Sequence, residues 1–110
     1  MPKNIDNKLN DLLDINSSIK KETKAVPMVK ERPVTDRTAN IETDYKYARE
    51  HLYDLIERGQ DAIDGILDLS KESEHPRAYE VAGQLIKTVG ETAEKLIDLQ
   101  QKMKKLEDND

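Results

Sequence analysis

The chain of 110 residues contains no cysteine, no phenylalanine and no tryptophan. Without cysteine there is no disulfide framework, no thiolate zinc site and no thiol nucleophile. Aromatic residues, all of them tyrosine, make up only 4% of the chain, and hydrophobic residues of all kinds make up 35%. Because so little apolar material is available for a central core, we expect one small domain that gains further burial by associating with other chains.

Long hydrophobic runs are also missing. No segment approaches the roughly 20 apolar residues that a membrane-spanning helix needs, and the N-terminus lacks the continuous apolar core of a secretory signal peptide. Together with the absence of cysteine, these two features predict a soluble protein of the cytoplasm.

Residues that could carry enzyme chemistry are scarce as well. The four glycines are isolated, so they form no phosphate-binding loop. His51 and His75 are the only histidines and have no second ligand at a metal-binding spacing. Asp61, Asp64 and Asp68 share one side of a helix, where a solvated acidic face is the expected role. The sequence therefore predicts no catalytic residues, no cofactor, no metal site and no enzyme.

What the chain does have is two stretches in which apolar or small residues recur at alternating spacings of four and three. The first stretch comprises Ile41, Tyr45, Ala48, Leu52, Leu55, Gly59, Ala62, Ile66 and Leu69; the second comprises Ala78, Ala82, Leu85, Val89, Thr92, Leu96, Leu99, Met103 and Leu106. A 3.5-residue repeat is typical of helices that pack against partners along one seam. A polar break with Pro76, which suits the first turn of a helix, separates the stretches. The pattern predicts an all-α fold built on a long antiparallel helical hairpin, with helices at about 41–72 and 77–107 and a turn at about 73–76.

The N-terminal part is expected to differ from residues 41–110. Residues 1–16 contain a short amphipathic patch and predict a short helix. Residues 17–40 include Pro27 and Pro33, show no helical period and are predicted to form an extended linker. Residues 1–40 carry 8 basic and 6 acidic groups, whereas residues 41–75 carry 4 and 10. Any contact with DNA phosphates is therefore expected in this arm; the candidate residues are Lys20, Lys21, Lys24, Lys30, Arg32 and Arg37.

Both long helices have apolar residues beside their main seams. Tyr53, Ile56, Ile63 and Leu67 lie beside the first seam, and Tyr79, Ile86, Ala93 and Ile97 lie beside the second. Two apolar flanks per helix predict packing within the hairpin and against a neighbouring subunit, and a heterologous contact repeated by rotation closes into a ring. The predicted oligomer interface comprises Leu52, Leu55, Ile56, Ile63, Ile66, Leu85, Ile86, Val89, Leu96, Leu99 and Met103.

The second arm carries a moderately specific motif. It reads His75-Pro76-Arg77-Ala78-Tyr79-Glu80-Val81, then Gly83-Gln84-Leu85-Ile86, and later Glu94-Lys95-Leu96-Ile97-Asp98-Leu99-Gln100-Gln101-Lys102-Met103-Lys104. With the Glu42-Thr43-Asp44-Tyr45 entry to the first long helix and the early patch from Asn7 to Ile15, it resembles the small terminase subunit of T4-like tailed bacteriophages. The likeness covers most of the chain. One departure is that members of this family usually continue well beyond the second helix.

This resemblance implies a non-catalytic component of viral DNA packaging. It implies a ring of about a dozen subunits that recognises viral double-stranded DNA and regulates the ATPase and nuclease of the large terminase subunit. The expected partners are thus further copies of the chain, the large subunit and viral DNA, with no membrane. The expected location is the host cell cytoplasm and not the mature virion. The alternative interpretation is a homo-oligomeric coiled-coil adaptor, which would form a dimer or small bundle with no packaging motor.

Overall fold

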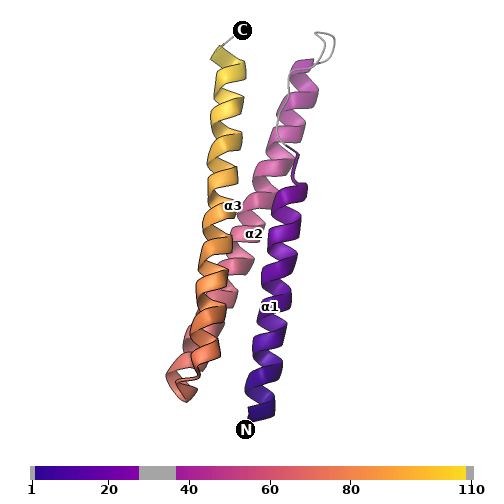
Figure 1. Ribbon diagram of the computed structural model, residues 1–110. Helices are drawn as coiled ribbons and strands as arrows, with labels where there is room; N and C mark the ends of the chain where they lie inside the picture. The colour runs from indigo at the N-terminus through magenta and orange to yellow at the C-terminus, as the bar shows by residue number, and fades with distance from the viewer. Residues whose placement is uncertain (1, 28–36, 109–110) are drawn as a thin grey trace.

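The computed structural model describes residues 2–27 and 37–108. They form three α-helices, which are α1 (Pro2–Ala25), α2 (Arg37–Ser73) and α3 (Pro76–Asp108) (Figure 1). The described residues contain no strand, so the predicted all-α class is confirmed.

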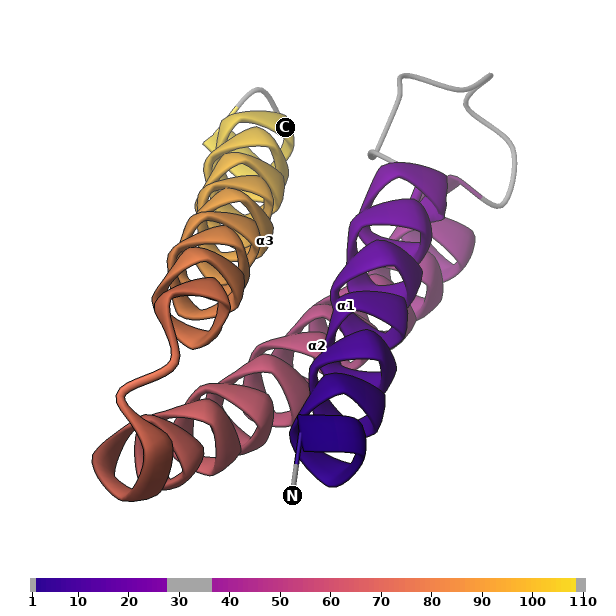
Figure 2. The ribbon, with the colours of Figure 1, turned by 60° about the horizontal axis from the view of Figure 1, so that its bottom comes forward.

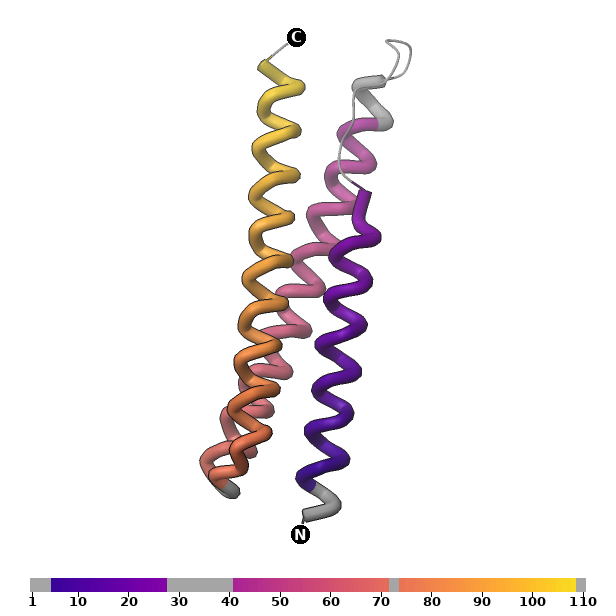
Figure 3. Tube along the Cα trace, in the orientation of Figure 1, coloured from indigo at the N-terminus to yellow at the C-terminus, as the bar shows by residue number. Residues whose placement is uncertain are grey.

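The three helices lie side by side in an elongated bundle of 61 × 18 × 14 Å. α2 runs opposite to both α1 and α3, so α1 and α3 are parallel (Figures 1 and 2). Every pair of helices is in contact, and α2 and α3 share the longest contact. The chain reverses between α2 and α3 at one end of the bundle (Figure 3). α1 therefore packs along the pair formed by α2 and α3.

Most of the main seam positions of α2 and α3 are buried, as their spacing predicts, while Tyr45, Val89 and Leu106 are half-buried. Leu52, Leu55 and Ile66 of α2 and Leu85 and Leu99 of α3 are completely inaccessible. Apolar residues of all three helices form two clusters, one around Leu9, Ile66 and Leu85 and the other around Ile19, Leu52 and Leu99. Small residues, among them Gly59, Ala62 and Ala82, complete the seams. The core is thus a three-helix core, to which α1 contributes fully.

The first helix is longer than its apolar pattern predicts. α1 continues to Ala25, so residues 17–25 are helical and are not part of an extended linker. The reason is that polar residues occupy two core positions of α1. Buried Asn16 accepts a hydrogen bond of 2.5 Å from the Thr88 hydroxyl, and buried Thr23 shares one of 2.8 Å with Thr92. These pairs satisfy groups that would be costly to bury alone, but they interrupt the apolar period on which the prediction depended.

The end of α1 and the start of α2 also differ from the prediction. Pro27 follows α1 closely, and a residue that precedes proline is disfavoured in helical conformation. Residues 28–36 of the predicted linker, among them Lys30 and Arg32, lie outside the described residues. α2 begins at Arg37 rather than near residue 41. Helix therefore occupies much of the segment that was expected to be extended.

The turn between α2 and α3 is tight. Only Glu74 and His75 separate the helices, and Glu74 has a positive φ of 47°. Its amide donates to the Ser70 carbonyl at 3.0 Å, which satisfies one of the free carbonyls at the end of α2. Pro76 is the first residue of α3, where its missing N–H is harmless. The reversal lies within the predicted turn at 73–76.

Gly59 marks a close approach of α2 and α3. A Cβ atom built on Gly59 would collide with the Val89 side chain, whereas one built on Gly90 would meet no atom within 4 Å. We expect Gly59→Ala to lower the free energy of unfolding by about 1–3 kcal/mol through overpacking. The matched control Gly90→Ala should raise it by about 1 kcal/mol, because alanine is the better helix former. Urea unfolding at equal assembly state checks both values; equal effects would contradict the close approach.

Candidate interaction surfaces

Most of the predicted oligomer interface is occupied within the chain itself. Seven of its residues are buried among the three helices, namely Leu52, Leu55, Ile66, Leu85, Leu96, Leu99 and Met103. Ile56, Ile63 and Val89 are half-buried, and only Ile86 is exposed, at 56%. The reason is that α1, which is longer than predicted, packs along α2 and α3 and covers residues that the hairpin alone would leave exposed. The buried positions stabilise the single chain, and a contact between subunits needs other residues.

Such residues lie on a second side of α2 and α3, which we call the exposed apolar face. It consists of Tyr53, Ile56, Ile63 and Leu67 of α2 and Tyr79, Ile86, Ala93 and Ile97 of α3. The large members Tyr53, Leu67, Tyr79, Ile86 and Ile97 have exposed fractions between 42% and 58%. They are five of the seven large hydrophobic side chains that are exposed in the described part of the chain. Their clustering on one face is unusual for a surface that meets only water.

The exposed apolar face points away from α1. On α3, Thr88 and Lys95 bond to α1. Ile86 precedes Thr88 by two residues and Ile97 follows Lys95 by two. Two residues correspond to about 200° of helical rotation, so both isoleucines lie on the side opposite to α1. The same argument applies to α2. His51 approaches Glu22 of α1. Tyr53 follows His51 by two residues, so Tyr53 also lies on the side opposite to α1.

The two halves of the face run side by side. The proximity of Gly59 and Val89 sets the register of the antiparallel pair. In this register Ile63 lies level with Ile86, and Tyr53 lies level with residues close to Ile97. The apolar residues of α2 and α3 thus form one continuous surface rather than two separate stripes.

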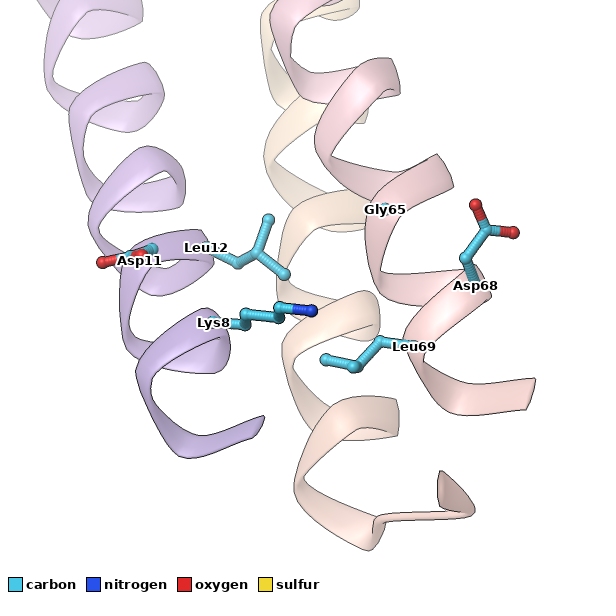
Figure 4. A pocket seen from close by; sticks show the side chains of 6 residues that line it. All are labelled: Lys8, Asp11, Leu12, Gly65, Asp68 and Leu69. Atoms are coloured by element: carbon cyan, nitrogen blue, oxygen red, sulfur yellow. The ribbon is translucent and has the colours of Figure 1, made fainter. Parts of the chain in front are cut away.

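A groove between α1 and α2 provides a different surface. It contains a hollow of about 390 Å³ lined by Lys8, Asp11, Leu12, Gly65, Asp68 and Leu69. Figure 4 shows Leu12 and Lys8 extending from α1 toward α2, where Gly65 contributes no side chain. A second hollow, also of about 390 Å³, is lined by Leu12, Ile15, Ser18, Arg58, Asp61 and Ala62. A third, of about 190 Å³, lies beside Val26, Tyr47 and Ala48. The groove is open, and small residues of α2 form its floor.

Polar contacts hold α1 against α2 and α3. Arg58 donates to the Glu22 carboxylate at 2.9 Å, and Ser18 donates to the same group at 3.1 Å. The hydrogen bond from Arg58 is the main cause that lowers the pKa of the Glu22 carboxyl below its ordinary value, while partial burial opposes it. At the other end of α1, Arg77 donates to Asn10 at 2.8 Å.

The candidate DNA-contact residues are distributed over α1 and the segment after it. Lys20, Lys21 and Lys24 are exposed on the last turns of α1. Lys30 and Arg32 lie outside the described residues, and Arg37 is the first residue of α2. The three described lysines are therefore held on a helix and not on an extended arm.

Lys95 is a lysine that the sequence did not single out. Its ammonium group donates to the carbonyl oxygens of Thr23 at 2.6 Å and Lys24 at 3.3 Å. These carbonyls are among the last of α1, which have no partner inside the helix. Burial lowers the pKa of the Lys95 ammonium group. No periodicity signals this role, because it depends on where α1 ends beside α3.

Metal-binding clusters and membrane-spanning helices are both absent from the described ranges. Residues 2–27 and 37–108 contain no group of three or more His, Cys, Asp or Glu side chains that could hold a metal ion. Of the helices described, none is long and apolar enough to cross a bilayer. What the described chain offers is the exposed apolar face, the α1–α2 groove and the lysines of α1.

Comparison with known proteins places the chain in a family. A family model described as "Terminase DNA packaging enzyme" matches residues 4–110. Comparison with curated proteins and with solved structures found no match. The family match spans all three helices, and the resemblance of the sequence to a terminase component is thereby supported at the level of the family. The chain belongs to the terminase DNA packaging family.

Proposed function

We propose that this chain is the small subunit of the terminase, as in T4-like phages, and has no catalytic activity of its own. In this proposal, copies of the chain assemble into a ring, bind viral DNA and regulate the ATPase and nuclease of the large subunit in the host cytoplasm. Family membership supports a role in DNA packaging. The elongated shape of the molecule, 61 × 18 × 14 Å, supports the assembly role, since a thin helical bundle presents long surfaces to its partners.

The exposed apolar face is the observation that carries the proposal. Its five large side chains expose on the order of 500 Å² of mostly apolar surface, given that a fully exposed aromatic presents about 150–250 Å². A stable interface buries about 800 Å² per partner, and subunit interfaces are about 65% apolar. The face thus has the apolar chemistry of a subunit interface and supplies more than half of the area that one partner buries.

Assembly is tested by replacing the central residue of this face. Ile86→Asp places a charge in the proposed interface, where burying it unpaired is costly, so we expect a monomer in place of the wild-type oligomer. Native mass spectrometry measures the change, and circular dichroism shows whether the helices remain. The control Ile86→Val keeps an apolar side chain and should still assemble. A wild-type chain that is monomeric, or an Ile86→Asp variant of unchanged mass, would refute assembly through this face.

DNA binding is expected to depend on the lysines of α1. Replacing Lys20, Lys21 and Lys24 with glutamine should weaken binding to double-stranded DNA and flatten its dependence on salt. Every phosphate that the variant no longer neutralises should reduce the slope of log affinity against log salt by about 0.9. Fluorescence anisotropy between 50 and 200 mM salt, the range over which phosphate neutralisation has large effects, measures both changes. Replacing Lys102, Lys104 and Lys105 of α3 removes the same charge elsewhere; an equally large effect in that control would rule out a specific role for α1.

A further inference from the structure

We infer that the exposed ridge of α3 docks into the α1–α2 groove of a second copy of the chain. The α3 ridge is defined as Tyr79, Ile86 and Ile97. The inference rests on the proposed self-association and specifies its geometry. The contact is heterologous, because one copy contributes a ridge and the next copy contributes a groove.

The groove repeats with the spacing of a helical seam. Every α2 residue that lines the second hollow lies seven positions before one that lines the first. The pairs are Arg58 and Gly65, Asp61 and Asp68, and Ala62 and Leu69. The third hollow follows about ten residues further along α1, beside Ala25 and Val26. At a rise of 1.5 Å per residue, the first two hollows are about 10 Å apart.

The α3 ridge repeats with the same spacing. Tyr79 and Ile86 are seven residues apart, and Ile97 follows after eleven more. Gly83 and Gly90 lie beside these residues and have open space around them, so the three large side chains project above the helix surface. Side chains that project at one heptad spacing and hollows at the same spacing are the two halves of knobs-into-holes packing.

The chemistry of each side chain matches the hollow that it would enter. The hollow of Figure 4 is lined by the apolar side chains of Leu12 and Leu69, and the Lys8 side chain reaches into it while the Asp11 and Asp68 carboxylates point away, which suits the ring and hydroxyl of Tyr79. The second hollow is lined by Leu12, Ile15 and Ala62 together with Ser18, Arg58 and Asp61, and its apolar half suits Ile86. The third offers Val26 and Ala48 to Ile97.

The ridge and the groove lie at the same positions along the bundle axis. Asn16 bonds Thr88 and Thr23 bonds Lys95, and both pairs are separated by 72 residues. Within one copy, Ile86 is therefore level with the residues next to Ile15, and Ile97 is level with the residues next to Val26. A neighbour needs no shift along the bundle axis to place its ridge in the groove.

This agreement in level favours a ring over a helical filament. A heterologous contact with a shift along the axis continues as a helix, whereas one with rotation alone can close. The ridge also faces away from α1, while the groove lies beside α1, so one copy can use both surfaces at once. The geometry permits a closed ring in which the bundles stand side by side and α1 contributes one wall of every interface.

Cysteine pairs test the contact directly, because the native chain contains no cysteine. In a chain with Ile15→Cys and Ile86→Cys, mild oxidation should give a ladder of disulfide-linked multimers that ends at the ring size. The control with Ser17→Cys and Ile86→Cys puts the first cysteine on the other side of α1 and should give no ladder. If only dimers form, and the Ile86→Cys single variant forms them equally, the contact is face to face. That result would overturn this inference and leave self-association intact.

A mixing experiment gives independent evidence. Gly65→Trp fills the first hollow without meeting other atoms at its Cβ, and Ile86→Asp removes the ridge. Each variant alone should self-associate at least 100-fold more weakly than wild type, while a 1:1 mixture should give heterodimers by native mass spectrometry. Each heterodimer would use the one intact ridge and the one intact groove. Full assembly of Gly65→Trp alone would overturn the inference, whereas a monomeric wild-type chain would overturn the proposed assembly itself.

Discussion

A Leu85→Asp variant is expected to lose its folded structure, although Ile86→Asp, one residue further, should keep it. Leu85 is 0% exposed and lies in the cluster shared by α1, α2 and α3. An unpaired carboxylate at this position should cost several kcal/mol, which is a large part of the about 5–15 kcal/mol that stabilises a typical domain. Leu96→Asp should behave in the same way, because Leu96 is buried in the second cluster.

Thermal unfolding followed by circular dichroism measures this difference. Leu85→Asp should show low helicity at 25 °C or a greatly reduced melting temperature, and Ile86→Asp should melt cooperatively as a helical monomer. The comparison also separates two causes of failed assembly, namely an unfolded chain and a missing interface. A Leu85→Asp chain that keeps wild-type helicity and melting would show that α1 does not form the core described.

The second large effect is expected on the packaging motor. If the chain regulates the large terminase subunit as a ring, many identical weak contacts act together, and their sum exceeds a single contact by about 10²–10⁴ in avidity. The acidic side chains of α2, among them Asp54, Glu57 and Asp64, are exposed and repeat in every copy. Ile86→Asp should therefore stimulate the motor ATPase far less than wild type at equal subunit concentration.

An ATPase assay with the purified large subunit tests this expectation. The control is Ile86→Val, which should assemble and stimulate normally. Full stimulation by a confirmed Ile86→Asp monomer would refute avidity as the basis of regulation. The absence of stimulation by intact wild-type assemblies would instead refute the proposed regulatory role of this chain.

The two long helices and their core could be predicted from the sequence alone. Their seams hold apolar residues at alternating spacings of four and three residues over many turns, and Pro76 signals the start of α3. Such signals are local and repeat, so every turn of helix adds evidence for the same assignment. The apolar residues beside the seams were also visible in the sequence as a second surface.

The tertiary structure alone decided which residues serve the single chain and which remain for a partner. Leu85 and Ile86 have similar hydrophobicity and both belonged to the predicted interface, yet α1 leaves only Ile86 exposed. α1 itself was underestimated, because Asn16 and Thr23 look like breaks in an apolar period. Their partners Thr88 and Thr92 are about 70 residues away in the sequence. A buried polar position is satisfied by a group that only the packing of helices brings near, and a local pattern carries no record of that group.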